Sequence, residues 1–155
     1  MASNRQIFLA NLAQTSTAPL MLEIERAEGM YLFDVNSKKY LDLIAGISVS
    51  NLGHSNPAVV AAVKAQAEKY MHLMVYGEFV ESPQVKFAKR LTEFLPPSLN
   101  NVYFTNSGAE ATEGAMKLAK RATGRTQFVS FKNSYHGSTQ GALSILGDEY
   151  FKRQF

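Results

Sequence analysis

Helix-type and strand-type segments alternate along the chain from residue 56 onward, and this alternation limits the folds that the chain can adopt. Two of the helix starts are marked by proline, whose fixed backbone angle suits the first helical positions. The expected elements are a helix from Asn56-Pro57, a helix from Ser82-Pro83, a strand at 102–105, a helix at about 108–123, a strand at 126–131 and a helix from Ser138. Such alternation is typical of βαβ units and a mainly parallel sheet. The sequence therefore predicts an α/β fold.

The first fifty residues follow a different pattern. A short helix is expected at 4–14, and β-type runs follow at 20–24, 30–33 and 40–44. Turn-forming residues separate these runs, so the runs should pair as a small antiparallel meander. We expect a boundary near residue 50, between this meander and the α/β part.

The expected parallel sheet is incomplete. Two parallel strands cannot cover the faces and edges of a sheet. The sequence therefore predicts a domain that is cut partway, and an isolated chain that exposes apolar surface and associates with itself.

Composition excludes several classes of protein. Hydrophobic residues make up 46% and charged residues 19%, which is a globular rather than a disordered balance. The net charge of +3 comes from basic residues scattered among acids, so no nucleic-acid partner is expected. With neither a signal peptide nor a membrane-length apolar run recognisable, a cytoplasmic location without a membrane partner is expected.

One segment has the character of an anion site. Residues 102–105 lead through Asn106-Ser107-Gly108 directly into a helix, whose first N–H groups and positive dipole end suit a phosphate. The alternative is an ordinary junction in which Ser107 caps the helix and Glu110 completes a capping box. Local physics alone favours this alternative. The helix itself should bury a narrow stripe on one side: Ala111, Ala115, Leu118 and Ala122.

A second segment presents an aromatic ring. The expected strand at 126–131 ends in a polar loop that carries Tyr135, His136 and Gly137. Ligands of open α/β sheets bind beyond the carboxyl ends of strands, so this loop and Ser107 should lie at the same edge. Taken singly, Tyr135 is better explained as a packed loop residue and His136 as a turn residue.

Together the two segments and the N-terminal part resemble the class III (ornithine/acetylornithine/4-aminobutyrate-type) aminotransferases, which depend on pyridoxal 5'-phosphate (PLP). The matching positions are residues 29–34, 40–42, 53–54, 57, 104–111, 117–119, 135–137 and 139. They occur in the order and at the spacing of the family, from about residue 19 to the end. This series outweighs the separate alternatives given above.

The resemblance implies the fold type I architecture of PLP enzymes. Residues 1–50 would be an N-terminal segment of the small domain, and residues 51–155 the first part of the large PLP-binding domain. Gly108 and Ala109, with Ser107 beside them, would hold the phosphate of PLP through backbone N–H groups. Tyr135 would stack on the pyridine ring, and His136 would lie next to it. Such enzymes are usually homodimers.

The implied reaction moves an amino group from an amine or ω-amino acid donor to an oxo acid. The Schiff-base lysine of the family lies downstream of the matched residues, and Lys117, Lys120 and Lys132 match no catalytic position, so the 155-residue chain alone should be inactive. The acetylornithine and 4-aminobutyrate branches carry an arginine for a substrate carboxylate where this chain has Ser138. This difference favours other donors.

Several alternatives remain open at this stage. The chain could be a non-catalytic module that binds PLP or another phosphate, or part of a family aminomutase or decarboxylase. Tyr76 is the one candidate for a substrate contact outside the two segments. His54, His72 and His136 lack the spacing of metal ligands, so no metal site is expected.

Overall fold

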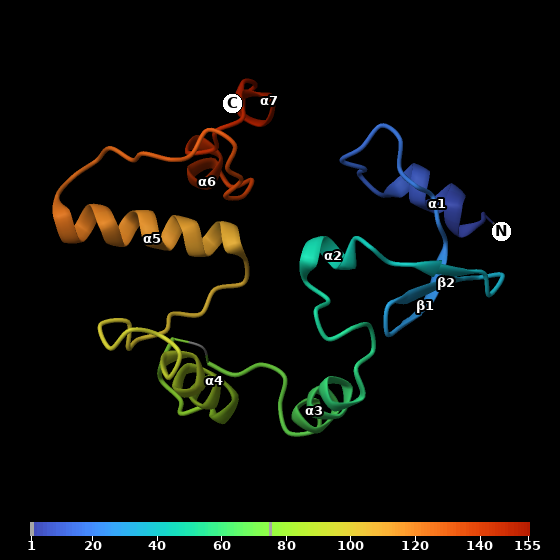
Figure 1. The fold of residues 1–155 in the computed structure, drawn as a ribbon, viewed down its shortest axis with the longest axis horizontal. Coiled ribbons are helices and arrows are strands. Elements are labelled where there is room, and N and C mark those ends of the chain that lie inside the picture. Colours follow the sequence, from blue (N-terminus) through green and yellow to red (C-terminus); the bar gives the residue numbers. More distant parts are fainter. Residues whose placement is uncertain (1, 75) are drawn as a thin grey trace. The chain divides into compact units, whose positions relative to one another are not determined.

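The computed structural model describes residues 2–74 and 76–155 and divides the chain into two compact units, Met1–Phe79 (unit 1) and Val80–Phe155 (unit 2) (Figure 1). Unit 1 holds α1 (Asn4–Asn11), β1 (Ile24–Glu28), β2 (Tyr31–Asp34), β3 (Lys39–Leu41), α2 (Ala45–Ser48) and α3 (Pro57–Ala67). Unit 2 holds α4 (Ser82–Thr92), α5 (Gly108–Thr123), α6 (Gln140–Ser144) and α7 (Glu149–Lys152). The helices predicted from Pro57, from Ser82 and over 108–123 are confirmed. The one predicted from Ser138 begins two residues later.

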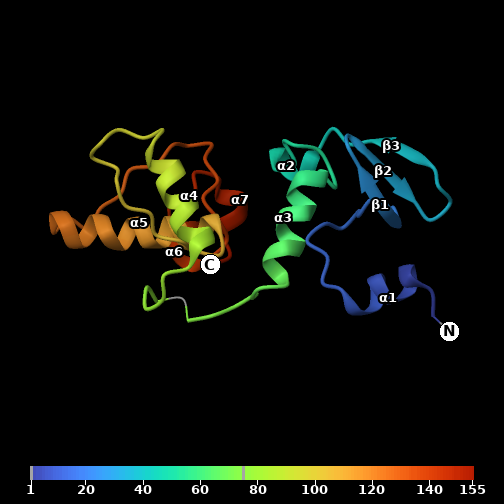
Figure 2. The ribbon, with the colours of Figure 1, turned by 90° about the horizontal axis from the view of Figure 1, so that it is seen from below.

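The strands of unit 1 form an antiparallel meander in the order β1-β2-β3 (Figure 2). Leu32 in the central strand pairs with Ala27 on one side and with Tyr40 on the other. The predicted meander is confirmed, but its first strand begins at Ile24 rather than at residue 20. The backbone of Met21 is left-handed, with φ +57°, which interrupts an extended run at 20–23.

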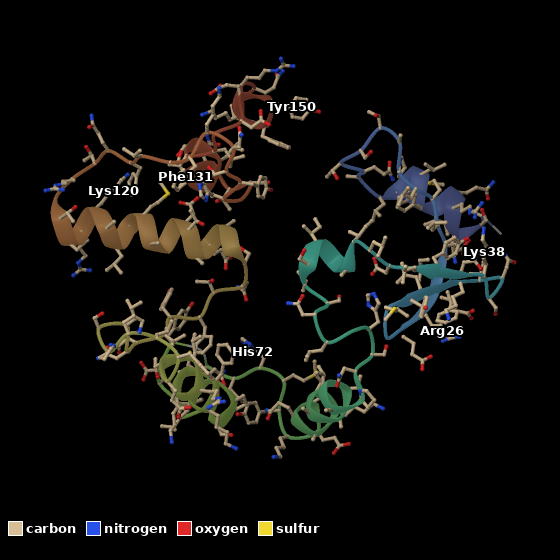
Figure 3. The ribbon with its side chains drawn as sticks, viewed as in Figure 1. Arg26, Lys38, His72, Lys120, Phe131 and Tyr150 are labelled. Atoms are coloured by element: carbon tan, nitrogen blue, oxygen red, sulfur yellow. The ribbon has the colours of Figure 1, made fainter. Side chains whose placement is uncertain are left out.

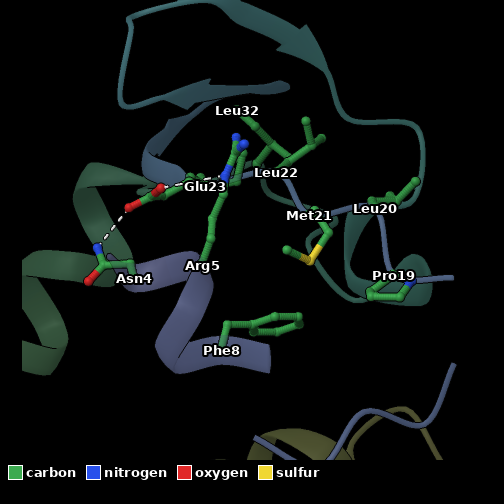
Figure 4. Close-up of a pocket in the computed structure, with 10 residues that line it drawn as sticks. Asn4, Arg5, Phe8, Pro19, Leu20, Met21, Leu22, Glu23 and Leu32 are labelled. Carbon is green, nitrogen blue, oxygen red and sulfur yellow. Dashed lines mark hydrogen bonds and ion pairs between the residues drawn. The ribbon is translucent and has the colours of Figure 1, made fainter. Parts of the chain in front are cut away.

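The N-terminal helix α1 is fixed to the chain that leads into β1. Ser3 and Gln6 form a capping box at its start. Asn4 donates from Nδ2 to Glu23 at 2.7 Å, and Arg5 pairs with the same carboxylate at 3.9 Å (Figure 4). The space between α1 and residues 19–24 is a mainly apolar cavity of about 500 Å³.

Unit 2 departs from the predicted α/β pattern. The segments 102–105 and 126–131 form no strand within the residues that the structure describes. Val129 is fully exposed, and Phe131 (labelled in Figure 3) is 86% exposed. A strand needs neighbours that satisfy its N–H and C=O groups, and no described segment supplies them here. The mixed α/β class is confirmed, with a small antiparallel sheet and helices, whereas the two parallel strands are not formed.

The predicted buried stripe of α5 is also wrong. Ala111, Ala115 and Ala122 are exposed, and Leu118 is 67% exposed. The half-buried side of the helix carries Ala109, Thr112, Glu113 and Met116 instead. The segment around α6 packs on that side, as the contacts described below show, while no described part of unit 2 covers the alanine side.

Little of the described chain is buried. The buried hydrophobic residues are Ala142, Leu143 and Leu146, all in or next to α6, while many large apolar side chains are exposed. Apolar surface on this scale marks contact areas for other protein surface. None of the helices in the described ranges has the length and apolar character that a membrane crossing requires.

Candidate functional site

The start of α5 is capped from both directions. Ser107 has extended backbone angles, and its Oγ accepts the N–H of Glu110 at 3.1 Å. The Glu110 carboxylate in turn accepts the N–H of Asn106 at 2.7 Å. The ordinary helix junction weighed against the anion site is therefore present, with the reciprocal bond shifted one residue toward the N-terminus.

This capping leaves an anion site open. Neither Gly108 N–H nor Ala109 N–H has an acceptor among the described residues. A Cβ added at Gly108 would meet nothing within 4 Å, so a ligand can approach the backbone there. Two free N–H groups, the positive end of a 16-residue helix and the hydroxyl proton of Ser107 together suit a phosphate. The nearby Glu110 carboxylate opposes an anion, but its hydrogen bond turns it toward Asn106.

The loop with Tyr135 and His136 lies on this same helix start. Gly137 has φ +127°, and a Cβ added there would lie 2.5 Å from the Cβ of Ala109 and 2.9 Å from its Cα. One turn further along α5, Thr112 donates from Oγ1 to the carbonyl oxygen of His136 at 3.3 Å. The sequence predicted that both segments lie together at a strand edge. The structure brings them together through contacts with α5 instead.

The side chain of Tyr135 is 62% exposed, so its ring has a free surface. Its hydroxyl shares a hydrogen bond of 2.8 Å with Ser138 Oγ, and its ring meets Phe151 edge-on with the centroids 5.9 Å apart. These two contacts restrain the ring. An exposed, restrained aromatic ring on a loop that contacts the helix start suits a planar phosphorylated ligand. His136 beside it is half-buried.

Tyr76 belongs to unit 1, whereas the other candidates belong to unit 2. Its side chain is 86% exposed. A role of Tyr76 toward a substrate stays a prediction.

Sequence reasoning missed a pair of side chains in unit 1. His54 Nε2 lies 2.7 Å from Asp42 Oδ2. Asp42 also accepts the N–H groups of Ile44 and Ala45, at 3.0 and 2.9 Å. The bond from Ala45, followed by the bond from His54, holds the pKa of Asp42 below its ordinary value. The pair fixes the chain before α3.

A comparison with protein families identifies the class to which this chain belongs. The model of the family described as aminotransferase class-III matches residues 12–155. The chain belongs to the class-III aminotransferases. Proteins of this family use PLP, and a solved relative contains it.

The chain is similar to individual members over most of its length. It is 45% identical over 145 residues to an acetylornithine aminotransferase of Archaeoglobus fulgidus, covering 94% of this chain and 37% of that protein. The structure of adenosylmethionine-8-amino-7-oxononanoate aminotransferase from Methanocaldococcus jannaschii matches with a TM-score of 0.89 at 36% identity, covering 97% of this chain and 37% of that one.

A taurine:2-oxoglutarate aminotransferase of Bifidobacterium kashiwanohense, solved with PLP and glutamate, matches with a TM-score of 0.83 at 36% identity. The match covers 92% of this chain and 32% of that structure. The chain therefore spans about a third of the length of these relatives.

Proposed function

We propose that the gene product carrying this chain is a PLP-dependent aminotransferase that moves an amino group from an amine or ω-amino acid donor to an oxo acid. The observation that supports the proposal is the contact of Gly137 with Ala109, which attaches the Tyr135 loop to a helix start whose first two N–H groups have no acceptor among the described residues. Membership of the class-III family supports it.

Each site residue has a definite part in this proposal. The N–H groups of Gly108 and Ala109, with the Ser107 hydroxyl, hold the cofactor phosphate. Tyr135 covers one face of the pyridine ring and keeps water from it, and His136 lines the same loop. When bound, PLP supplies an electron sink for carbanion chemistry at the substrate. Tyr76 contributes a substrate contact.

The same proposal assigns the domains and the oligomeric state of the gene product. Residues 1–50 belong to the small domain and residues 51–155 to the large one. The gene product is a homodimer, and the many exposed apolar side chains of the chain support a partner surface. A cytoplasmic location stays a prediction from the sequence.

The lysine that carries the cofactor covalently is expected to lie outside this chain. In the described structure Lys120 lies 5.5 Å from the centre of the Phe128 ring, on the part of α5 farthest from Gly108. Borohydride reduction of the PLP-loaded gene product, followed by peptide mapping, should therefore find the cofactor on a lysine outside residues 1–155. Finding it on Lys117, Lys120 or Lys132 would contradict this assignment of the lysine but keep PLP as the cofactor.

The serine at position 138 leads to a prediction about the amino donor. It offers a small hydroxyl, already bonded to Tyr135, where a guanidinium would bind a substrate carboxylate. The gene product should therefore use a simple amine with a higher kcat/KM than N-acetylornithine. Ser138→Arg should raise kcat/KM for N-acetylornithine relative to kcat/KM for the amine by about tenfold, since a charge-assisted hydrogen bond contributes about 1.5–3 kcal/mol.

Ser138→Ala is the control for this experiment, because it loses the bond to Tyr135 without adding a charge. It should leave the ratio of the two donors unchanged. Preference of the natural protein for N-acetylornithine would contradict the proposed donor. Binding of PLP without amino transfer to any oxo acid would contradict the aminotransferase itself and favour a binding module, an aminomutase or a decarboxylase.

A further inference from the structure

Glu113 connects α5 to the segment that follows the Tyr135 loop. Its Oε1 accepts the N–H of Gly141 at 2.9 Å. Hydrogen bonding from Thr139, followed by the bond from the backbone of Gly141, holds the pKa of the Glu113 carboxylate below its ordinary value. The contact is close, because a Cβ added at Gly141 would overlap the carboxylate. The Glu113 carboxylate thus holds the backbone at the start of α6 through the N–H of Gly141.

The carboxylate completes a row of contacts along one side of α5. Ala109, Thr112 and Glu113 stand three and four residues apart, which places them on one face of the helix. Ala109 meets Gly137, Thr112 binds the His136 carbonyl, and Glu113 binds the start of α6. The first two contacts are a van der Waals contact and a long hydrogen bond, so the charged group is the strongest of the three.

Tyr135 directly precedes the residues that this row of contacts attaches to α5. The loop between the two attached positions, Gly137 and Gly141, is short. Ser138 in this loop shares a hydrogen bond with the Tyr135 hydroxyl. The free N–H groups of Gly108 and Ala109 lie at the start of the same helix face. Tyr135 is therefore linked to Glu113 through Ser138 and Gly141, in addition to the contacts that His136 and Gly137 make with α5. PLP carries its ring and its phosphate in one molecule, so its affinity depends on the distance between the Tyr135 ring and the N–H groups of Gly108 and Ala109.

We propose that Glu113 is a positioning residue for the cofactor: by binding the start of α6 it fixes the Tyr135 loop at the distance from Gly108 and Ala109 that the ring and phosphate of PLP require. The proposal rests on the proposed function, since it takes PLP as the ligand. Glu113 itself touches neither ring nor phosphate. Lys117, one turn along α5, is the charged side chain whose attraction also lowers the pKa of Glu113.

The test compares Glu113→Ala and Glu113→Gln in the apo form of the complete gene product, with Arg121→Gln on the exposed part of α5 as the control. Inorganic phosphate needs only the helix start, whereas PLP needs both the helix start and the ring. Glu113→Ala should raise the Kd of PLP at least tenfold and reduce the induced circular dichroism of the bound cofactor. It should change the Kd of inorganic phosphate less than threefold. Glu113→Gln keeps one acceptor oxygen and should restore most of the PLP affinity.

Other outcomes overturn the proposal. Equal losses for PLP and phosphate in Glu113→Ala would show general unfolding of the site, and an unchanged Kd for PLP would show that the attachment does not position the ring. If the natural protein binds phosphate but no PLP, the proposed function fails separately. The attachment itself is then measured by hydrogen exchange at the Gly141 N–H, which Glu113→Ala should accelerate and Arg121→Gln should not. Unchanged exchange in Glu113→Ala would remove the attachment as well.

Discussion

Replacing Gly137 with alanine should lower the free energy of unfolding by about 3 kcal/mol and weaken the binding of PLP about tenfold or more. Two costs add at this position. The added Cβ would lie 2.5 Å from the Cβ of Ala109, so the loop must move off the helix, and φ +127° is a conformation that residues with a Cβ rarely adopt. The loss of affinity follows because the moved loop carries Tyr135 away from Gly108. Thermal denaturation and PLP titration of the complete gene product measure the two effects.

Gly124→Ala is the matched control for the conformational cost. Gly124 has φ +70° at the C-terminal end of the same helix, and a Cβ added there would meet nothing within 4 Å. This variant should lose only about 1 kcal/mol of stability and none of its PLP affinity. If Gly137→Ala behaves like Gly124→Ala in both measurements, the loop is not held against Ala109.

A negative charge at Ser107 should remove most of the affinity for PLP without unfolding the helix. Aspartate and asparagine cap helices about as well as serine, so Ser107→Asp and Ser107→Asn should both keep the melting temperature. Only aspartate repels a phosphate. At a separation of roughly 5–6 Å and an effective dielectric constant of about 20, two unit charges repel by about 3 kcal/mol, which corresponds to about a hundredfold in Kd.

Pyridoxal, which lacks the phosphate, separates charge repulsion from other damage. Ser107→Asp should bind pyridoxal as well as Ser107→Asn does, while the two variants differ about a hundredfold for PLP. The difference should shrink at high salt, because screening weakens the repulsion. Equal PLP affinity in the two variants would mean that the phosphate binds elsewhere.

The helices could be predicted because their ends are encoded locally. Asn56 caps α3 with its side chain and Pro57 follows it, and Ser107 and Gly124 cap the two ends of α5. Each of these signals acts within a few residues of the helix end, so a single sequence contains it.

The parallel strands and the buried side of α5 could not be predicted in this way. The hydrophobic run at 126–131 favours a strand, but a strand forms only where another strand pairs with it. The alanine stripe of α5 favours close packing, yet the structure packs the side with Thr112 and Glu113, because the chain returns to that side after Gly137. Both features depend on contacts distant in sequence.

The site residues show the same difference between local signals and contacts distant in sequence. The resemblance indicated Gly108, Ala109 and Tyr135 from short motifs, and the structure adds the contact of Gly137 with Ala109 that brings the two motifs together. Glu113 could not be recognised, because an acidic residue on a helix reads as a surface charge until its partners at the start of α6 are known. A substrate contact by Tyr76 stays a prediction.

The most direct test of this account is a crystal structure of the complete gene product with PLP bound. We expect phosphate oxygens within about 3.2 Å of the backbone nitrogens of Gly108 and Ala109, and the Tyr135 ring stacked on the pyridine ring. A phosphate bound away from the start of α5, or a pyridine ring without contact to Tyr135, would contradict the account.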